Sequence, residues 1–370
     1  MDRSQSGDSA QWTELLLSLP QPHLLQAWQW GELKGKYGWQ AERHYWHEAG
    51  VCRAAAQILF RTHTLPGIGI PLTIAYCPRG PVLDWSDSAL RHRVLADLSL
   101  LAQTRSAIFL KIDPGVSVGT GEPGSPEAAE DPLGRSVCQD LAAADWRASA
   151  EQIQFRNTYT LDLRAAENDL LAGMKQKTRY NIGLAHRKGV QIRQGGIQDL
   201  DLLYRMYAET SLRDGFAIRK PEYYRDAWGA FIEAGSAQAL IAAIADEPVA
   251  ALLVYRFGPT AWYLYGMSRT VHREAMPTHL LQWEAIRWAR ARGCSLYDFW
   301  GAPDRLDSGD PMWGVHRFKA GFGARLVWTI GAWDLPLRPA LYALYSGVLP
   351  KVMAVWRARG HRQTRQSIDS

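Results

Sequence analysis

The sequence is poor in cysteine, and its cysteines are not placed for a metal site or a disulfide framework. Four occur in 370 residues, Cys52, Cys77, Cys138 and Cys294, with no CxxC pair and no zinc-ligand spacing to histidine. Scattered single cysteines are typical of proteins from a reducing compartment rather than of secreted disulfide scaffolds. The sequence therefore predicts neither a disulfide framework nor a bound metal.

Long apolar runs are also missing. No uncharged apolar stretch reaches the roughly 18 residues that a membrane-spanning helix needs, and the N-terminal stretch MDRSQSGDSAQW lacks the apolar core of a secretory signal. There is no P-loop, dinucleotide-binding glycine fingerprint, HExxH or GxSxG motif. These absences predict a cytoplasmic protein and argue against the enzyme classes that those motifs mark.

What the sequence has in quantity is tryptophan, together with a modest excess of positive charge. Hydrophobic residues make up 47% and charged residues 21%, which is a globular composition, and 16 residues are tryptophan. Tryptophan combines a large apolar face with one N–H donor, so it suits both cores and ligand grooves. The net charge of +5 favours anionic partners, and the length allows two domains.

Hydrophobic periodicity divides the chain into two halves of similar order. The first half predicts helices over 12–19, 23–34 and 86–106 and strands over 42–46, 51–60, 73–77 and 107–112. The Gly- and Pro-rich stretch 115–133 predicts a loop. The second half predicts helices over 168–188, 200–212, 221–234 and 278–292 and strands over 158–163, 239–244, 248–257, 260–268, 295–300 and 326–330. The shared order indicates a duplicated α+β unit of acetyltransferase type.

Such units usually bind coenzyme A through a Q/R-x-x-G-x-G/A loop at the start of a helix, and this chain lacks that loop. The G-x-G stretches 67–69 and 321–323 are preceded at the required position by Thr64 and Phe318. We therefore expect neither an acyl-CoA donor nor any other bound cofactor.

Two predicted helices carry polar residues in patterns that suit anionic ligands. In the helix over 23–34, Gln26, Trp30 and Lys34 share one face, which fits a groove wall with an anion-binding end as well as it fits a surface helix with a buried tryptophan. The helix over 168–188 has a basic stripe, and residues 170–198 contain six Lys and Arg and no acid. We interpret the stripe as an anion-facing surface, with a merely solvated basic face as the alternative. Its residues are Lys175, Arg179, His186 and Arg187.

The stretch W-G-V-H-R-F-K-A-G-F-G at 313–323 concentrates glycines, aromatics and basic residues. Its glycines suit a tight path of the backbone beside a ligand. Lys319 stands between Phe318 and Phe322, where apolar walls would strengthen pairing with an anion. A glycine-rich turn with a solvated lysine is the alternative. In the strand over 260–268, Tyr263 and Tyr265 are two residues apart and are predicted to emerge on the same face.

Taken in order, these stretches resemble the FemABX peptidyltransferases. The resemblance covers the chain from about residue 12 to residue 335 and rests on six motifs that occur in the family's order. They are Gln26-x-x-x-Trp30-x-x-x-Lys34, A-H-R-K-G-V at 185–190, R-D-G-F-A-I-R-K-P-E-Y-Y at 213–224, W-Y-L-Y-G-M-S at 262–268, Y-D-F-W-G at 297–301 and F-K-A-G-F-G at 318–323.

The resemblance implies an α+β fold of two tandem acetyltransferase-like (GNAT) domains, here without the coiled-coil arm that some members insert. The first domain would comprise 1–153 and 328–370, so that the C-terminal segment completes it, and the second would comprise 154–327. The implied activity transfers an amino acid from aminoacyl-tRNA, the co-substrate, to the peptide-stem amine of a peptidoglycan precursor. The precursor is lipid II or UDP-muramyl-pentapeptide, and the product is the interpeptide bridge.

The resemblance also implies roles for single residues. Substrate-binding positions that hold the diphosphate and sugar of the muramyl peptide are matched by Lys34, Arg219, Tyr223 and Tyr265, with Gln26 and Trp30 beside Lys34. Asp113, in the strand end L-K-I-D-P, matches a carboxylate near the reaction centre. Phe318 and Lys319 match a pair that lines the channel toward the acyl donor. Asp113 and Lys319 are therefore the expected catalytic residues. Without the coiled-coil arm, the tRNA contact is left to the domain surfaces, and the basic stripe of Lys175, Arg179, His186 and Arg187 is the candidate for it.

Two other functions stay open on the sequence. One is a GNAT-fold N-acyltransferase that acts on a different amine, and the other is a non-catalytic protein that binds cell-wall precursors or tRNA. The C-terminal segment 337–359 is apolar and aromatic, and basic residues occur from Lys351 onward. This pattern suits peripheral contact with an anionic membrane at the inner face of the plasma membrane, or equally a helix packed on the body with a solvated tail.

Overall fold

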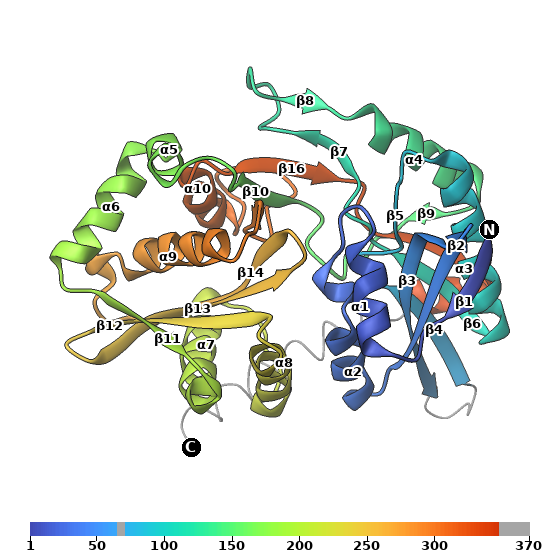
Figure 1. Ribbon diagram of the computed structural model, residues 1–370, viewed down its shortest axis with the longest axis horizontal. Coiled ribbons are helices and arrows are strands. Elements are labelled where there is room, and N and C mark those ends of the chain that lie inside the picture. Colours follow the sequence, from blue (N-terminus) through green and yellow to red (C-terminus); the bar gives the residue numbers. More distant parts are fainter. Residues whose placement is uncertain (65–70, 348–370) are drawn as a thin grey trace. The chain divides into compact units, whose positions relative to one another are not determined.

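A computed structural model describes residues 1–64 and 71–347 of the chain, which divides into two compact units (Figure 1). Unit 1 contains residues 1–158 and the described residues from Leu326 onward, and unit 2 contains Tyr159–Arg325. Residues 339–347 are helical, and the rest of the predicted C-terminal helix, with the basic residues from Lys351 onward, lies outside the described residues.

Unit 1 is built on a mixed sheet in the order β1-β2-β3-β4-β6-β17-β9, with β5 paired to β3. Only β4 and β6 run parallel. Strand β17, which follows unit 2 in the chain, returns to pair with β6. The strands are β1 (Asp2–Gln5), β2 (Gln40–Glu48), β3 (Val51–Thr64), β4 (Pro71–Cys77), β5 (Val82–Leu83), β6 (Ala107–Ile112), β9 (Arg147–Ala148) and β17 (Trp333–Pro336).

The core of unit 1 lies between this sheet and α3. The α3 helix starts where the Asp87 carboxylate accepts the amide proton of Leu90, and it buries Val94 and Leu98 against the sheet. Burial of such side chains is the main stabilising term in a unit of this size. The helices are α1 (Ser9–Leu17), the 3₁₀ turn η1 (Leu24–Gln26), α2 (Trp28–Lys36), α3 (Ser88–Thr104) and α4 (Pro132–Ala143).

The predicted loop over 115–133 is partly wrong. It contains β7 (Ser117–Thr120) and β8 (Ala129–Glu130), which pair with each other, and Pro132 starts α4. Strand β7 also pairs with β16 (Arg325–Thr329). Because that partner lies some two hundred residues further along the chain, no local pattern reveals this strand.

Unit 2 is built on the strand order β11-β12-β13-β14-β15-β10, in which only β14 and β15 are parallel. Helices α7 and α8 cover one face, and α9, with α6 beside it, covers the other (Figure 1). The strands are β10 (Thr158–Asp162), β11 (Gln191–Gly195), β12 (Ala237–Ile244), β13 (Glu247–Phe257), β14 (Thr260–Ser268) and β15 (Leu296–Asp298). The helices are α5 (Glu167–Gly173), α6 (Gln176–Arg187), η2 (Ile197–Asp199), α7 (Leu200–Asp214), α8 (Pro221–Glu233), η3 (Arg273–Ala275), α9 (Pro277–Ala291) and α10 (Trp313–Gly321).

Two helix predictions and one loop prediction need correction. The helix over 23–34 is interrupted at Ala27, whose backbone is extended, so η1 and α2 are separate elements. The helix over 168–188 is interrupted at Met174 and Lys175, where the Lys175 amide donates to the Gly321 carbonyl instead of continuing the helix. The predicted glycine-rich path over 313–323 is mostly the helix α10.

Both units repeat one arrangement, in which a helix connects two parallel neighbouring strands. In unit 1 α3 lies between β4 and β6, and in unit 2 α9 lies between β14 and β15. The predicted duplication of an α+β unit is confirmed. Among the helices with both ends described, the longest is α3 with 17 residues, so this part of the chain has no coiled-coil arm. None of the helices in residues 1–64 and 71–347 has the length and apolar character to cross a bilayer.

Candidate active site

Lys319 is a buried lysine held by two consecutive backbone carbonyls. Its Nζ atom donates to the carbonyl oxygens of Trp300 and, at 2.6 Å, of Gly301, and only 5% of the residue is exposed. Burial lowers the pKa of Lys319 to about 7, although the nearby Asp298 carboxylate acts in the opposite direction. Near neutral pH the side chain therefore exists as both ammonium and amine, which suits a group that exchanges protons during a reaction.

The turn after β15 positions these carbonyls. The Asp298 carboxylate accepts the amide proton of Trp300 at 2.7 Å, and Trp300 and Gly301 both have positive φ. Two successive residues in this conformation direct their carbonyls to the same point. An ammonium has three donors, so two bind the turn and, among the described residues, one remains for a ligand oxygen.

Gly321 of α10 serves close packing of two helices rather than a ligand loop, whereas a Cβ atom on Gly314 would meet open space. A Cβ atom on Gly321 would stand 2.5 Å from the Thr178 hydroxyl of α6, and only Gly323, just beyond the helix, has positive φ. Phe318 packs on His279 and on Phe322, with ring centroids 5.1 Å apart in each pair. The predicted burial of Lys319 among apolar side chains is thus correct, but the backbone that carries it is helical.

Tyr263 and Tyr265 lie on opposite faces of the unit 2 sheet, so the prediction of a shared face is wrong. A β-bulge at Leu264 places Tyr265 opposite Leu253 and Tyr263 opposite Val254, which are adjacent residues of β13. Tyr263 consequently faces α10, where its ring centroid lies 6.0 Å from the Lys319 Nζ atom.

Three of the predicted ligand-binding residues belong to one aromatic cluster on the α7–α8 face of unit 2. The exposed Arg219 guanidinium lies 4.6 Å from the ring centroid of Tyr223. Tyr224 joins the other two, with ring centroids 5.4 Å from Tyr223 and 6.0 Å from Tyr265. Burial raises the pKa of Tyr223 and Tyr265, so both rings keep their hydroxyl protons as donors at neutral pH.

In unit 1, α2 brings Lys34 and Trp30 together. The Lys34 Nζ atom lies 4.4 Å from the Trp30 ring centroid, and Trp30 is buried. This cation–π contact holds the ammonium at the end of α2.

Gln26, which the sequence grouped with them, has a different role. Its side chain is fully buried, donates to the Pro78 carbonyl at 2.6 Å and accepts the Gln57 amide proton at 2.6 Å. These contacts fix the turn after β4 and leave no exposed surface for a ligand.

Asp113 is also a buried anchor of the turn after β4. Its carboxylate accepts the Tyr76 hydroxyl proton and the Arg79 amide proton, each at 2.6 Å, and 3% of the residue is exposed. Arg79 has positive φ, so the carboxylate holds a strained backbone turn. Burial raises the pKa of Asp113, while the Arg79 charge and the Tyr76 hydrogen bond oppose that rise. The geometry makes Asp113 a positioning residue for this turn.

The predicted basic stripe lies on α6 and at its start. All four members, Lys175, Arg179, His186 and Arg187, are exposed. The Arg179 guanidinium donates to the Ala172 and Met174 carbonyls at the end of α5, so part of its hydrogen-bonding capacity is used within the unit.

The predicted residues are therefore distributed over both units, and the structure brings only some of them together. In unit 1 these are Trp30 and Lys34. In unit 2 Arg219, Tyr223 and Tyr265 form a cluster on the face of the sheet opposite Tyr263 and Lys319. Unit 1 holds Gln26, Trp30, Lys34 and Asp113, and unit 2 holds Lys175, Arg179, His186, Arg187, Arg219, Tyr223, Tyr265, Phe318 and Lys319. The sequence missed the Trp300 and Gly301 carbonyls because a backbone acceptor has no residue-type signature.

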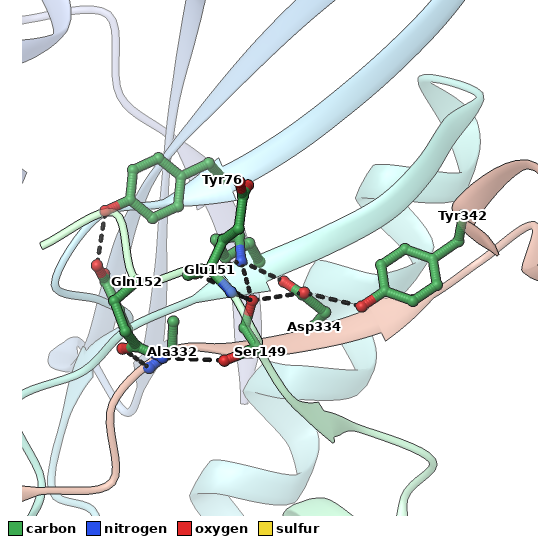
Figure 2. Close-up of polar contacts among 9 residues, drawn as sticks. Tyr76, Ser149, Glu151, Gln152, Ala332, Asp334 and Tyr342 are labelled. Atoms are coloured by element: carbon green, nitrogen blue, oxygen red, sulfur yellow. Dashed lines mark hydrogen bonds and ion pairs between the residues drawn. The ribbon is translucent and has the colours of Figure 1, made fainter. Parts of the chain in front are cut away.

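A buried polar cluster in unit 1 was also missed. The Lys111 ammonium and the Asp334 carboxylate form an ion pair at 2.8 Å with both side chains buried. Figure 2 shows Asp334 between Ser149 and Tyr342, both of which donate to its Oδ2 atom, at 2.7 and 3.0 Å. A lysine inside the apolar strand A-I-F-L-K-I was the available signal, since a charge in such a strand needs a partner.

Solved structures with the same fold were found. A crystal structure of FemX aligns with 94% of this chain and 100% of its own chain, with a TM-score of 0.82 and 23% identity. A tandem GNAT protein from the clavulanic acid biosynthesis pathway aligns with 90% of this chain and 97% of its own, with a TM-score of 0.50 and 16% identity. The fold is thus a pair of tandem GNAT-like units.

Curated relatives match over nearly their whole length. A lipid II:glycine glycyltransferase of Staphylococcus haemolyticus (strain JCSC1435) is 24% identical, with 90% of this chain and 92% of the relative covered. The lipid II:glycine glycyltransferase of Staphylococcus aureus (strain USA300) is also 24% identical, with 90% and 93% covered. Residues 11–245 and 232–349 match the FemAB family, and the chain therefore belongs to that family.

Proposed function

We propose that this protein is an aminoacyltransferase that moves an amino acid from aminoacyl-tRNA to the peptide-stem amine of a peptidoglycan precursor, lipid-linked or UDP-linked. Family membership and the names of the glycyltransferase relatives support the transferase class and the cell-wall acceptor. The observation that carries the proposal is Lys319, a buried lysine with a pKa near 7 and one donor left for a ligand oxygen.

The reaction is the aminolysis of an ester. The neutral acceptor amine attacks the ester carbonyl carbon, and a C–N bond forms while the C–O bond to the tRNA ribose breaks. The attacking nitrogen loses one proton and the ribose oxygen takes one up, so the step is balanced. A fixed cation at the carbonyl oxygen stabilises the negative charge that develops there. We assign this role to the Lys319 ammonium, which can also supply the proton to the leaving oxygen.

The acceptor's diphosphate needs cations. We assign this role to Arg219, whose planar guanidinium forms two parallel hydrogen bonds to phosphate oxygens, and to Lys34, which acts as a point charge. Arg219 is exposed and is oriented by the Tyr223 ring, and Lys34 is oriented by the Trp30 ring. Asp113 acts indirectly in this scheme, by holding the turn after β4 in place.

The test is mass spectrometry of lipid II and of UDP-muramyl-pentapeptide after incubation with the protein and mixed charged tRNAs. We expect a mass increase of one or more amino acid residues on one acceptor, and the increment identifies the amino acid. No increase with any charged tRNA would contradict the proposal. Precursor binding without turnover would indicate the non-catalytic binding protein. Full activity of Lys34→Ala and Arg219→Ala with an amine acceptor that lacks a diphosphate would indicate an N-acyltransferase with a different acceptor.

A further inference from the structure

A hollow of about 740 Å³ lies in unit 2, between the C-terminal half of α9, strand β11 and the chain that follows β10. Leu163, Leu240 and Trp288 are buried and line its apolar part. Lys319 and the Trp300–Gly301 turn are not among the residues that line it. The volume falls within the range of ligand pockets, so it is large enough for a ligand of its own.

The hollow is lined by five arginines from three separate segments. The two carboxylates that also line it, Glu167 and Glu284, both pair with Arg287. Outside the lining, Asp162 pairs with Arg164 and Asp199 pairs with Arg193. The five arginines are Arg164, Arg193, Arg287, Arg290 and Arg292.

Two of these guanidinium groups have no carboxylate partner among the described residues. Arg290 donates only to the Leu163 and Ala165 carbonyls, at 3.2 and 3.0 Å. The Arg292 guanidinium lies 4.2 Å from the Trp288 ring centroid. Burial, and after it the like charge of Arg256, lower the pKa of Arg292, and an anion placed here would favour its charged form.

The dipole of α9 explains part of this arrangement. Cations near the C-terminus of a helix are stabilised by the carbonyls of its last turn, and Arg290 is in that turn. Arg164 and Arg193, however, come from the other side of the hollow, after β10 and in β11. A convergence of three segments on one hollow therefore needs a different cause.

We propose that this hollow binds phosphate groups along an RNA strand, and that it is a docking site for the tRNA donor away from the reaction centre. The identity of the RNA as a tRNA rests on the proposed function. An RNA strand fits better than a free nucleotide, because Arg164, Arg193 and Arg287 are exposed and stand on three segments. Such a set can pair with successive phosphates, and guanidinium groups bind phosphate through paired N–H donors.

The experiment measures binding of uncharged tRNA to the full chain by fluorescence anisotropy at several salt concentrations. Arg292→Gln and Arg290→Gln should each weaken binding by roughly threefold to tenfold and reduce the slope of log K against log salt by about 0.7 to 1. Arg290→Lys keeps the charge and should keep the slope.

Arg225→Gln is the matched control, because Arg225 is an exposed arginine of α8 that pairs with Asp201 outside the hollow. It should bind as the wild type does.

Arg290 also holds the chain after β10 through its two hydrogen bonds. Thermal unfolding of each variant therefore checks that the fold is kept. Arg292→Gln removes no hydrogen bond described within the unit. Equal affinities of the hollow variants and Arg225→Gln would overturn the inference. Displacement of bound tRNA by UDP at the same phosphate concentration would also overturn it, in favour of a free nucleotide. If the wild type transfers amino acids from charged tRNA while the hollow variants bind tRNA normally, only this inference fails. If the wild type binds no tRNA at all, the proposed donor fails with it.

Discussion

The Nζ atom of Lys319 lies 6.0 Å from the ring centroid of Tyr263, while Tyr265, two residues further along β14, points to the opposite face of the sheet. The β-bulge at Leu264 causes this separation. One short strand therefore supplies an aromatic ring to the buried lysine on the α10 side and another to the tyrosine cluster beside Arg219 on the α7–α8 side.

Replacement of Lys319 by methionine tests its role in the reaction. We expect kcat/KM to fall by about 100-fold to 1,000-fold, the usual effect of removing one group that stabilises an oxyanion. In the wild type the rate should decrease as pH rises through about 7, because the ammonium form is lost. The measurement is kcat/KM against pH for both proteins. A decrease near pH 7 that persists in Lys319→Met would assign it to another group.

Stability against pH gives an independent check on the same residue. The folded pKa of Lys319, about 7, is below that of an unfolded lysine. Between these two values the unfolded chain binds more protons, so the free energy of unfolding of the wild type should rise with pH from about 7 to about 10. Lys319→Met should lack this rise. Identical pH dependence of the two proteins in denaturant unfolding would show that folding does not lower the pKa of Lys319.

The absence of a side chain at Gly266 leaves the space that the Tyr263 ring occupies. A Cβ atom at this position would stand 1.8 Å from the Tyr263 hydroxyl and 2.7 Å from Cζ, so the ring must move away from its place near Lys319. We expect Gly266→Ala to cost about 1–3 kcal/mol, as overpacking usually does, and to lower kcat/KM. Gly229→Ala is the matched control, since its nearest neighbour is 3.6 Å away and alanine favours a helix by up to about 1 kcal/mol. Denaturant unfolding and rate measurements check both; an unaffected Gly266→Ala would contradict the placement of Tyr263.

Local patterns in the sequence were sufficient to predict helices and strands that have a clear hydrophobic periodicity and a capping residue or turn at their ends. The predicted strands over 107–112 and 260–268 coincide with β6 and β14, and α3 begins next to the predicted position because Asp87 caps it. Thr178, Ile182 and Ala185, which α6 buries, also follow the helical spacing of one face.

Elements and sites that depend on distant partners could not be predicted in this way. Glycines in α10 argued for a loop, yet Gly321 is needed for the close approach of α6, which only the tertiary structure reveals. The alternation rule failed at Tyr263 because a one-residue bulge reverses the face without any residue-type signal. Gln26 was grouped with Trp30 by helical spacing, but the extended Ala27 separates them.

The buried ion pair between Lys111 and Asp334 should be costly to break from one side. Asp334→Asn or Lys111→Met leaves one buried charge without its partner, which typically costs about 3–5 kcal/mol. The double variant Lys111→Met, Asp334→Leu should recover most of this loss, because it removes both desolvated charges. Glu130→Gln, in the exposed pair with Arg135, is the control and should cost less than about 1 kcal/mol. Denaturant unfolding measures all four; additive losses in the double variant would show that the two charges do not depend on each other.

Arg219 should determine the affinity for the acceptor and leave the affinity for the donor unchanged. Arg219→Lys keeps the charge but loses the planar fork and the stacking on Tyr223, so the acceptor KM should rise by about tenfold to 100-fold, corresponding to one charge-assisted hydrogen bond. Tyr223→Phe keeps the ring that supports the guanidinium and should have a smaller effect, and the two effects should not add. Arg225→Lys on the same helix is the matched control. Steady-state kinetics with acceptor and aminoacyl-tRNA varied separately make the distinction: if Arg219→Lys raises the donor KM instead, the guanidinium contacts the RNA and the acceptor's phosphates are bound elsewhere.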